Sequence, residues 1–229
     1  MSAPDPQLAI ARYRAHAAGY DATAARTMGL RRRTVARLAL QPGQTVLDVA
    51  CGTGLSFPLL QSGVGETGRV VGIELSPEML ALARERCARE GWRNLTLIES
   101  AIETAEIPAP IDAILFNFTH DVLRSPQALA RIFAAARPGA RVAVAGMKLA
   151  PWWLAPLNPI VRTQARPYMT TFEGLARPWD LLEAYLEHFE RESVLFGTGY
   201  IGWGIVGGSG LQAAIPHRAA DGAATARRG

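Results

Sequence analysis

Two carboxylates and two glycines form the part of the sequence best suited to chemistry. Asp48 lies in an apolar run that leads to Gly52 and Gly54, and Glu74 ends the next apolar run, 20 residues after Gly54. Glycine allows a positive φ angle and a close approach of the backbone to a ligand. An acid at the carboxyl end of a parallel strand can accept hydrogen bonds from both hydroxyls of a ribose. The pattern predicts a site for a nucleoside-bearing ligand, with Glu74 as an exposed acid that contributes little to the fold.

The same stretch favours one kind of nucleoside ligand over another. A dinucleotide site uses G-x-G-x-x-G, in which the third glycine permits tight packing of the helix that faces the pyrophosphate. Phe57 stands at the place of that third glycine, and Asp48 lies four residues before Gly52. A carboxylate there would repel a pyrophosphate but could hold an ammonium group. The expected ligand has a ribose, a cationic end and no phosphate, so we do not expect NAD to bind.

These residues resemble the motifs of the class I S-adenosylmethionine-dependent methyltransferases. Residues 48–54 resemble the first motif, with Ala50 in place of its first glycine, and residues 71–76 resemble the second, whose acid binds both ribose hydroxyls. Residues 111–116 and 137–142 are similar to the fourth-strand motif and to the turn before the fifth strand. The resemblance implies a Rossmann-like fold, S-adenosyl-L-methionine as the cofactor, and methyl transfer as the reaction.

The resemblance also implies which residues bind the cofactor. Many members carry Asp-Ala after the third strand, where the acid contacts the adenine amino group, whereas this chain has Glu99, Ser100 and Ala101. The Ser100 hydroxyl or the Glu99 carboxylate could accept that hydrogen bond, and the Ala101 amide could donate to the ring. Tyr13 or Tyr20 resembles the tyrosine region that closes over the cofactor in quinone-pathway members. The expected cofactor residues are Asp48, Ala50, Gly52, Gly54, Glu74, Leu75, Ser100, Ala101, Asn117 and Tyr20.

Polar residues follow the predicted fourth strand and are the candidates for acid–base chemistry. The carboxyl ends of strands in open α/β sheets face the ligand crevice. His120 has the side chain with the most suitable pKa for a base, and Asp121 adjoins it. Methyl transfer needs a base only where the attacking atom must lose a proton. His120 and Asp121 are therefore the candidate catalytic residues, and the alternative is that Thr119 and Asp121 only begin the next helix.

A proline-broken aromatic segment, residues 151–180, follows the predicted fifth strand. It contains five prolines, which exclude one continuous helix. It resembles the region where this family covers its substrate, and an aromatic pocket suits a planar or hydrophobic acceptor. The alternative is that these side chains only close the core. The candidate substrate residues are Trp152, Trp153, Tyr168 and Trp179, and no cysteine or histidine spacing predicts a metal site.

Apolar runs alternate with helical patterns along the chain. The expected strands are residues 45–50, 69–74, 95–98, 113–118 and 141–145, with closing strands at 193–196 and 200–206; the expected helices include 77–90 and 181–190. This order predicts an α/β fold, with a Rossmann-like doubly wound sheet that is mostly parallel and has an antiparallel closing strand. We expect one domain, residues 1–215, with an N-terminal helical cap at 1–41, a small lid insertion at 151–180, and a disordered tail at 216–229.

The composition of the chain limits the kinds of partner that we expect. The chain has 229 residues and a net charge of +4, and 23 of its 24 basic residues are arginine. The basic residues form no broad face interleaved with aromatics, and no proline follows Asn117 as in base-amino methylases, so no nucleic-acid partner is expected. Without a signal peptide, an 18-residue apolar run or a set of cysteines, the sequence favours the cytoplasm. The sequence leaves open whether the chain forms a homodimer.

The leading hypothesis is a methyltransferase that acts on O, N or C of a small hydrophobic or aromatic metabolite, its small-molecule acceptor. A phospholipid-headgroup N-methyltransferase is the alternative, because residues 151–154 and the basic cluster at 31–37 could touch a membrane surface, although this contact is not favoured. A non-catalytic module that binds S-adenosylmethionine is a further alternative, less favoured because Asp48 and Glu74 are both present.

Overall fold

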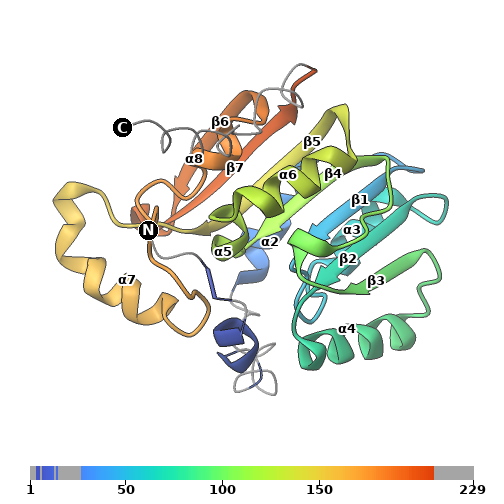
Figure 1. Cartoon of the computed structure of the whole chain (residues 1–229). Coiled ribbons are helices and arrows are strands. Elements are labelled where there is room, and N and C mark those ends of the chain that lie inside the picture. Colours follow the sequence, from blue (N-terminus) through green and yellow to red (C-terminus); the bar gives the residue numbers. More distant parts are fainter. Residues whose placement is uncertain (1–3, 6, 13, 15–26, 209–229) are drawn as a thin grey trace, which may run out of the picture.

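Seven strands form a single sheet in the computed structural model, which describes residues 4–5, 7–12, 14 and 27–208 (Figure 1). The strand order is β3-β2-β1-β4-β5-β7-β6; β7 is antiparallel to both of its neighbours, and the other neighbouring pairs are parallel. This confirms the predicted doubly wound sheet with an antiparallel closing strand. The strands are β1 Thr45–Val49, β2 Arg69–Glu74, β3 Leu95–Glu99, β4 Ile111–Asn117, β5 Ala136–Met147, β6 Leu186–Val194 and β7 Gly199–Val206.

Helices cover both faces of the sheet, as the alternating pattern predicts. One buried cluster joins α6 to the sheet, and a second lies under α2, α3 and α4. Among the described residues, no helix is long and apolar enough to cross a bilayer. The helices are α2 Met28–Arg37, α3 Phe57–Val64, α4 Pro77–Glu90, α5 His120–Leu123, α6 Pro126–Ala135, α7 Asn158–Ala165 and α8 Asp180–Glu183, with short 3₁₀ turns η2 Ile102–Thr104, η3 Trp152–Leu157 and η4 Leu195–Gly197.

Helix α4 begins and ends where the sequence predicts, and its start fixes the end of β2. The Ser76 hydroxyl accepts a hydrogen bond from the Met79 amide (3.3 Å), and Pro77 occupies the first turn. Gly91 ends the helix in the left-handed conformation at φ +71°. Because the chain turns into α4 within two residues of Glu74, the side chain at the end of β2 has a defined position.

The region after the lid differs from the sequence prediction. Residues 181–190 were expected to be helical, but α8 spans only Asp180–Glu183 and β6 begins at Leu186. The predicted strand 193–196 is the end of β6 and the turn η4. Strand β6 lies at the edge of the sheet and is rich in charged residues, so its own pattern resembles a solvated helix. Pairing with β7, interrupted by a register shift between Glu187 and Glu190, overrides that local pattern.

The strand order reverses at β1, which lies between β2 and β4. Ligands bind at such switch points, outside the carboxyl ends of the strands. Strands β1, β2 and β4 end at Val49, Glu74 and Asn117, so the glycine-containing turn, the second carboxylate and the polar residues after β4 meet at one edge of the sheet.

Candidate active site

A pocket lies at the carboxyl edge of β1, β2 and β4 and contains most of the predicted site residues. It encloses about 1050 Å³, part of it open to solvent. Gly54, Trp152, Trp153 and Trp179 do not line it, and Tyr20, like Tyr13, lies outside the described residues. The predicted residues that line it are Asp48, Ala50, Gly52, Glu74, Leu75, Ser100, Ala101, Asn117, His120, Asp121 and Tyr168.

The turn after β1 approaches the pocket in left-handed backbone conformations. Ala50, Gly52 and Gly54 have φ angles of +49°, +58° and +75°. A β-carbon on Gly52 would have only the end of the Met79 side chain near it, at 3.8 Å, so the backbone there faces open space. At Gly54 a β-carbon would lie 2.3 Å from the Phe57 ring, so this glycine lets Phe57 pack. The two glycines thus serve different purposes, exposure of the backbone and close packing.

Glu74 is buried, which makes the expectation of an exposed acid wrong. Only 6% of the residue is accessible, and its carboxylate accepts hydrogen bonds from the Gly52 amide (2.9 Å) and the Ser76 amide (2.8 Å). Burial raises the pKa of the Glu74 carboxyl, and the hydrogen bonds from these amides oppose the rise. Glu74 therefore holds the glycine turn to the start of α4, in addition to facing the pocket.

We expect Glu74→Ala to lower both ligand affinity and stability. Loss of a charged acceptor for ribose hydroxyls should weaken S-adenosylmethionine binding by about 10- to 150-fold, the factor for a hydrogen bond to a charged group. Two buried amides would also lose their acceptor, so the free protein should melt at a lower temperature. Calorimetric titration and thermal unfolding of the ligand-free variant measure the two effects. An unchanged affinity with a lower melting temperature would show that Glu74 is structural only.

Asp48 lines the pocket and has one carboxylate oxygen without a hydrogen-bond partner among the described residues. This atom, Oδ2, is buried. Burial raises the pKa of Asp48 to about 7; the Arg31 guanidinium lowers it, and the Glu74 carboxylate raises it further. A buried acid without a partner is a costly arrangement, and a cationic ligand group would compensate for that cost.

Arg31 is a site residue that the sequence did not single out. It is 5% exposed, donates from Nη1 to the Ser56 hydroxyl (3.1 Å), and lies over the Phe118 ring at 5.4 Å. The sequence placed it in a surface cluster of arginines. One signal was available: the helical spacing of Arg31, Thr34, Val35 and Leu38, all buried, marks the inner face of α2.

Asn117 and Ser56 extend this buried polar group. The Asn117 amide nitrogen donates to the Ser56 hydroxyl (3.2 Å), while its Oδ1 atom has no partner in the described part of the chain. Ser56 therefore contacts both Arg31 and Asn117, and it fixes the side chains at the ends of α2 and β4. Two buried acceptor oxygens, Asp48 Oδ2 and Asn117 Oδ1, remain for a ligand.

Of the residues at the end of β3, Ser100 and Ala101 lie at the pocket and Glu99 does not. The Ser100 amide donates to the Glu74 carbonyl (3.1 Å). The Ser100 hydroxyl donates to the Ala101 carbonyl (2.9 Å). Glu99 pairs with Arg84 instead (3.2 Å). For an adenine ring, Ser100 and Ala101 are thus better placed than Glu99.

His120 lines the pocket and has one ring nitrogen that can act as a base. Its Nε2 atom lies 3.0 Å from the Glu173 carbonyl, which can only accept, so Nε2 carries the proton. Nδ1 then has the lone pair, and it is buried without a partner among the described residues. Burial lowers the pKa of His120 below its usual value, with the Asp121 carboxylate opposing the shift. The imidazole is therefore neutral near pH 7 and can accept a proton at Nδ1.

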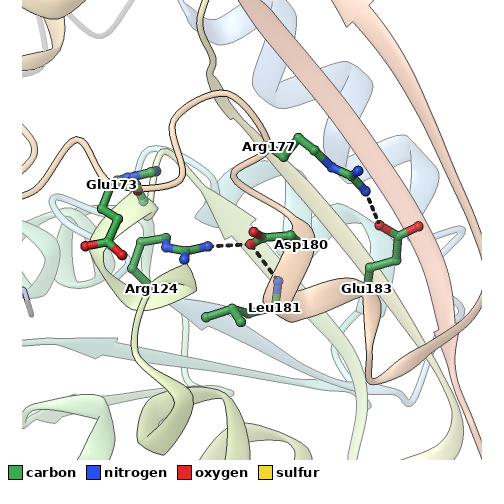
Figure 2. Close-up of polar contacts among 7 residues, drawn as sticks. Arg124, Glu173, Arg177, Asp180, Leu181 and Glu183 are labelled. Carbon is green, nitrogen blue, oxygen red and sulfur yellow. Dashed lines mark hydrogen bonds and ion pairs between the residues drawn. The ribbon is translucent and has the colours of Figure 1, made fainter. Parts of the chain in front are cut away.

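Asp121 connects this site to the lid. Its carboxylate accepts hydrogen bonds from the Thr170 amide (2.9 Å) and the Thr170 hydroxyl (2.7 Å). On the next turn of the chain, Arg124 forms an ion pair with Asp180 (Figure 2). A β-carbon on Gly174 would lie 2.6 Å from the Arg124 guanidinium, so the lid packs closely here. Asp121 thus holds the segment that contains the partner of His120.

The aromatic residues of the lid occupy three different environments. Tyr168 lines the pocket. Trp179 is 5% exposed and packs edge-on against Tyr200 (4.8 Å between ring centroids), within the main core. Trp152 and Trp153 are 85% and 64% exposed and lie away from the pocket. The structure therefore brings only Tyr168 of these four residues to the candidate active site.

The residues around the pocket fit the cofactor that the motifs imply. An adenosine group could lie against Ser100 and Ala101, its ribose against Glu74, and a cationic amino acid end against Asp48, whose Oδ2 atom lacks a partner. The open space at Gly52 leaves room for a ligand against the backbone. The buried acceptors are suited to an ammonium group and hydroxyls rather than to phosphate.

Comparisons with known proteins agree with this geometry. Residues 46–139 match a family model described as a methyltransferase domain. The chain is 31% identical over 114 residues to a demethylmenaquinone methyltransferase of Symbiobacterium thermophilum, covering 48% of this chain and 45% of that protein. It is 28% identical over 172 residues to a 2-phytyl-1,4-naphtoquinone methyltransferase of Synechococcus elongatus, covering 70% and 71%. The match thus spans about half the length of the first of these relatives.

Solved structures support the fold. A methyltransferase from Aquifex aeolicus described as SAM-dependent superposes with a TM-score of 0.58 at 22% identity, over 77% of this chain and 89% of that one. Its fold is that of the sheet described above. The fold, the motif positions and the match over residues 46–139 are similar to those of the class I S-adenosylmethionine-dependent methyltransferases.

Proposed function

We propose that the chain is a methyltransferase that transfers a methyl group from S-adenosylmethionine to O, N or C of a small hydrophobic or aromatic metabolite in the cytoplasm. One observation carries the proposal: His120, whose Nδ1 atom is buried and has no hydrogen-bond partner among the described residues, lines the same pocket as Glu74 and Asp48. A module that only binds its ligand has no use for such a base, whose burial without a partner is costly.

The chain's residues divide the work of the reaction. S-adenosylmethionine, when bound, supplies a methyl group that is already electrophilic. Glu74 would hold the ribose of the cofactor and Asp48 its ammonium group, and Arg31 would offer a positive charge to the carboxylate of the cofactor's amino acid end. His120 accepts the proton that the acceptor loses, and the Glu173 carbonyl keeps its Nδ1 atom unprotonated beforehand. The main contribution of the protein is to align the acceptor with the methyl group and exclude water.

The lining of the pocket favours an aromatic acceptor with an ionisable hydroxyl group. Such an acceptor needs a base, unlike a free amine, and it suits apolar surroundings. The relatives named as demethylmenaquinone and 2-phytyl-1,4-naphtoquinone methyltransferases support a ring of this type. Apolar and aromatic residues that line the pocket, beyond those assigned to the cofactor, include Ala9, Ile10, Phe118, Val122 and Tyr168.

A transfer assay with three acceptor classes tests the proposal. The purified chain is incubated with S-adenosylmethionine carrying a labelled methyl group and with naphthoquinols, ethanolamine phospholipids or a metabolite extract, or without any acceptor, and products are identified by mass. We expect label in the naphthoquinol or a related phenol, and cofactor binding with a micromolar Kd, roughly −7 to −8 kcal/mol. Label in the phospholipid would establish the headgroup alternative. Cofactor binding without transfer to a metabolite extract would establish a binding module, and binding of NAD alone would contradict both.

A further inference from the structure

An exposed apolar surface lies away from the pocket, on the segment with η3 and α7 and on the turn η4. We name it the aromatic patch; it consists of Trp152, Trp153, Leu157, Ile160, Leu195 and Phe196. Trp152 and Phe196 are almost fully accessible, at 85% and 93%. Monomeric soluble proteins rarely expose large apolar side chains together, and such patches mark interaction sites.

Two segments distant in sequence form the patch side by side. The Lys148 ammonium donates to the Gly197 carbonyl (2.7 Å), and a β-carbon on Gly197 would approach the Pro151 ring to 2.9 Å. The turn after β6 therefore lies against the start of η3. Figure 1 shows the segment with η3 and α7 at the outer edge of the molecule, apart from the sheet.

The turn at Leu195 and Phe196 is held in an unfavourable conformation. Both residues have positive φ angles, +53° and +54°, which bulky side chains rarely adopt. Neither side chain is buried by this conformation. Strain of this kind persists where it serves function rather than the core, and here it directs two large apolar side chains into solvent.

The charged residues of the segment that carries the two tryptophans have one sign. Residues 148–172 contain Lys148, Arg162 and Arg166 and no acidic residue. Arg162 and Arg166 are exposed, and neither forms an ion pair with a carboxylate in the part of the chain that the structure describes. On α7, Ile160 and Arg162 lie on opposite sides of the buried Val161. A chain segment that combines exposed tryptophans with unpaired arginines has the composition of a surface that lies in the interface of an anionic bilayer.

We propose that the aromatic patch, together with the exposed Arg162 and Arg166 at α7, docks this protein on the surface of a membrane that contains anionic lipid. Trp152, Trp153 and Phe196 enter the interface, and the two arginines contact the lipid phosphates. The docking does not depend on the identity of the methyl acceptor or on methyl transfer.

Vesicle flotation tests the proposal. The full chain is mixed with vesicles of phosphatidylcholine alone or with one third phosphatidylserine, at about 0.1 M and about 0.5 M salt. We expect binding to the anionic vesicles that weakens in high salt. Arg162→Gln with Arg166→Gln should weaken it about 25-fold, or fivefold for each charge. Trp152→Ser with Trp153→Ser should weaken it by roughly tenfold or more.

A matched control separates the patch from overall charge. Arg69 and Arg93 are exposed at the opposite edge of the sheet, near the start of β2 and β3. Arg69→Gln with Arg93→Gln removes the same charge and should leave binding unchanged. All variants should have the same melting temperature as the parent protein, because the substituted side chains are exposed.

Equal loss of binding in the control, or no binding to anionic vesicles by the parent protein, would overturn the proposal. A different result would also overturn it: the parent protein is a dimer in light scattering and does not bind vesicles, and Trp152→Ser with Trp153→Ser converts the dimer to a monomer. The patch would then bind a second copy of the chain.

Discussion

Asp48→Asn should make the ligand-free protein more stable while it weakens cofactor binding. The pKa of Asp48 is about 7 in the folded chain, whereas in the unfolded chain Asp48 loses its proton near the usual pKa of 3.8. The native state therefore binds the extra proton between these values, and stability falls as pH rises from about 4 to 7 and stays low above. A shift of about 3 units corresponds to about 4 kcal/mol, or about 10 °C in melting temperature.

The cofactor affinity of Asp48→Asn should change in the opposite direction. An uncharged amide in place of a carboxylate would weaken the bond to an ammonium group, lowering affinity by about 10- to 150-fold. In the parent protein affinity should fall as pH drops below about 7, because Asp48 must lose its proton to bind a cation. The variant should lack this pH dependence. Chemical unfolding and calorimetric titration at several pH values measure both effects.

Asp112→Asn is a suitable control for this experiment. Asp112 is an acid whose two oxygens both have partners, the Thr45 amide (2.8 Å) and the Arg137 guanidinium (2.6 Å). The same substitution there should lower stability. If Asp48→Asn also lowers stability at pH 8, the ionised Asp48 is stabilised by Arg31 more than burial destabilises it, and Asp48 is not an energetic cost of the site.

The second large effect is expected at His120. If its Nδ1 atom accepts the proton of the acceptor, His120→Ala should lower kcat by about 10²–10⁴-fold and leave cofactor binding intact. The kcat of the parent protein should rise with pH through a value below 6.5, since burial lowers the pKa of His120. The pH range in which kcat changes differs from the range in which cofactor affinity changes, so steady-state kinetics across pH can separate the effects of His120 and Asp48.

The structure suggests a control that keeps the lid in place. The side-chain amide of His120→Gln can still donate to the Glu173 carbonyl, but it offers no base, so its kcat should be as low as that of His120→Ala. An active His120→Gln with an inactive His120→Ala would show that His120 only holds the lid. Parental kcat in both variants would mean that alignment alone drives the transfer.

The central part of the fold follows from local sequence, whereas the closing part depends on distant partners. Residues 69–74 and 77–90 have the predicted bounds because apolar runs, Ser76 and Gly91 specify them locally. Strand β6 was missed because its charges suit either a helix or an edge strand, and only β7 decides between them. Sequence patterns report local preference, and tertiary pairing can override it.

The candidate site divides in the same way. Asp48 and Glu74 could be found from a motif at the ends of strands. The burial of Glu74 could not, because the amides of Gly52 and Ser76 reach it only after the turn and α4 have formed. Arg31 was read as a surface charge, since a basic cluster does not reveal which of its members faces inward. Trp152 and Trp153 lie in the same aromatic segment as Tyr168, and only the path of the lid in the structure shows that Tyr168 alone lines the pocket.

The hydroxyl of Thr170 connects two walls of the pocket that come from opposite parts of the chain. It donates to Asp121 and accepts from the Asp5 amide (3.0 Å), so the N-terminal residues and the lid share one side chain. Both Asp5 and Asp121 also line the pocket. In thermodynamic terms the two walls are linked: a ligand that orders one lowers the entropy cost of ordering the other. Because such coupling is reciprocal, cofactor and acceptor that contact different walls should bind with positive cooperativity, without any direct contact between them.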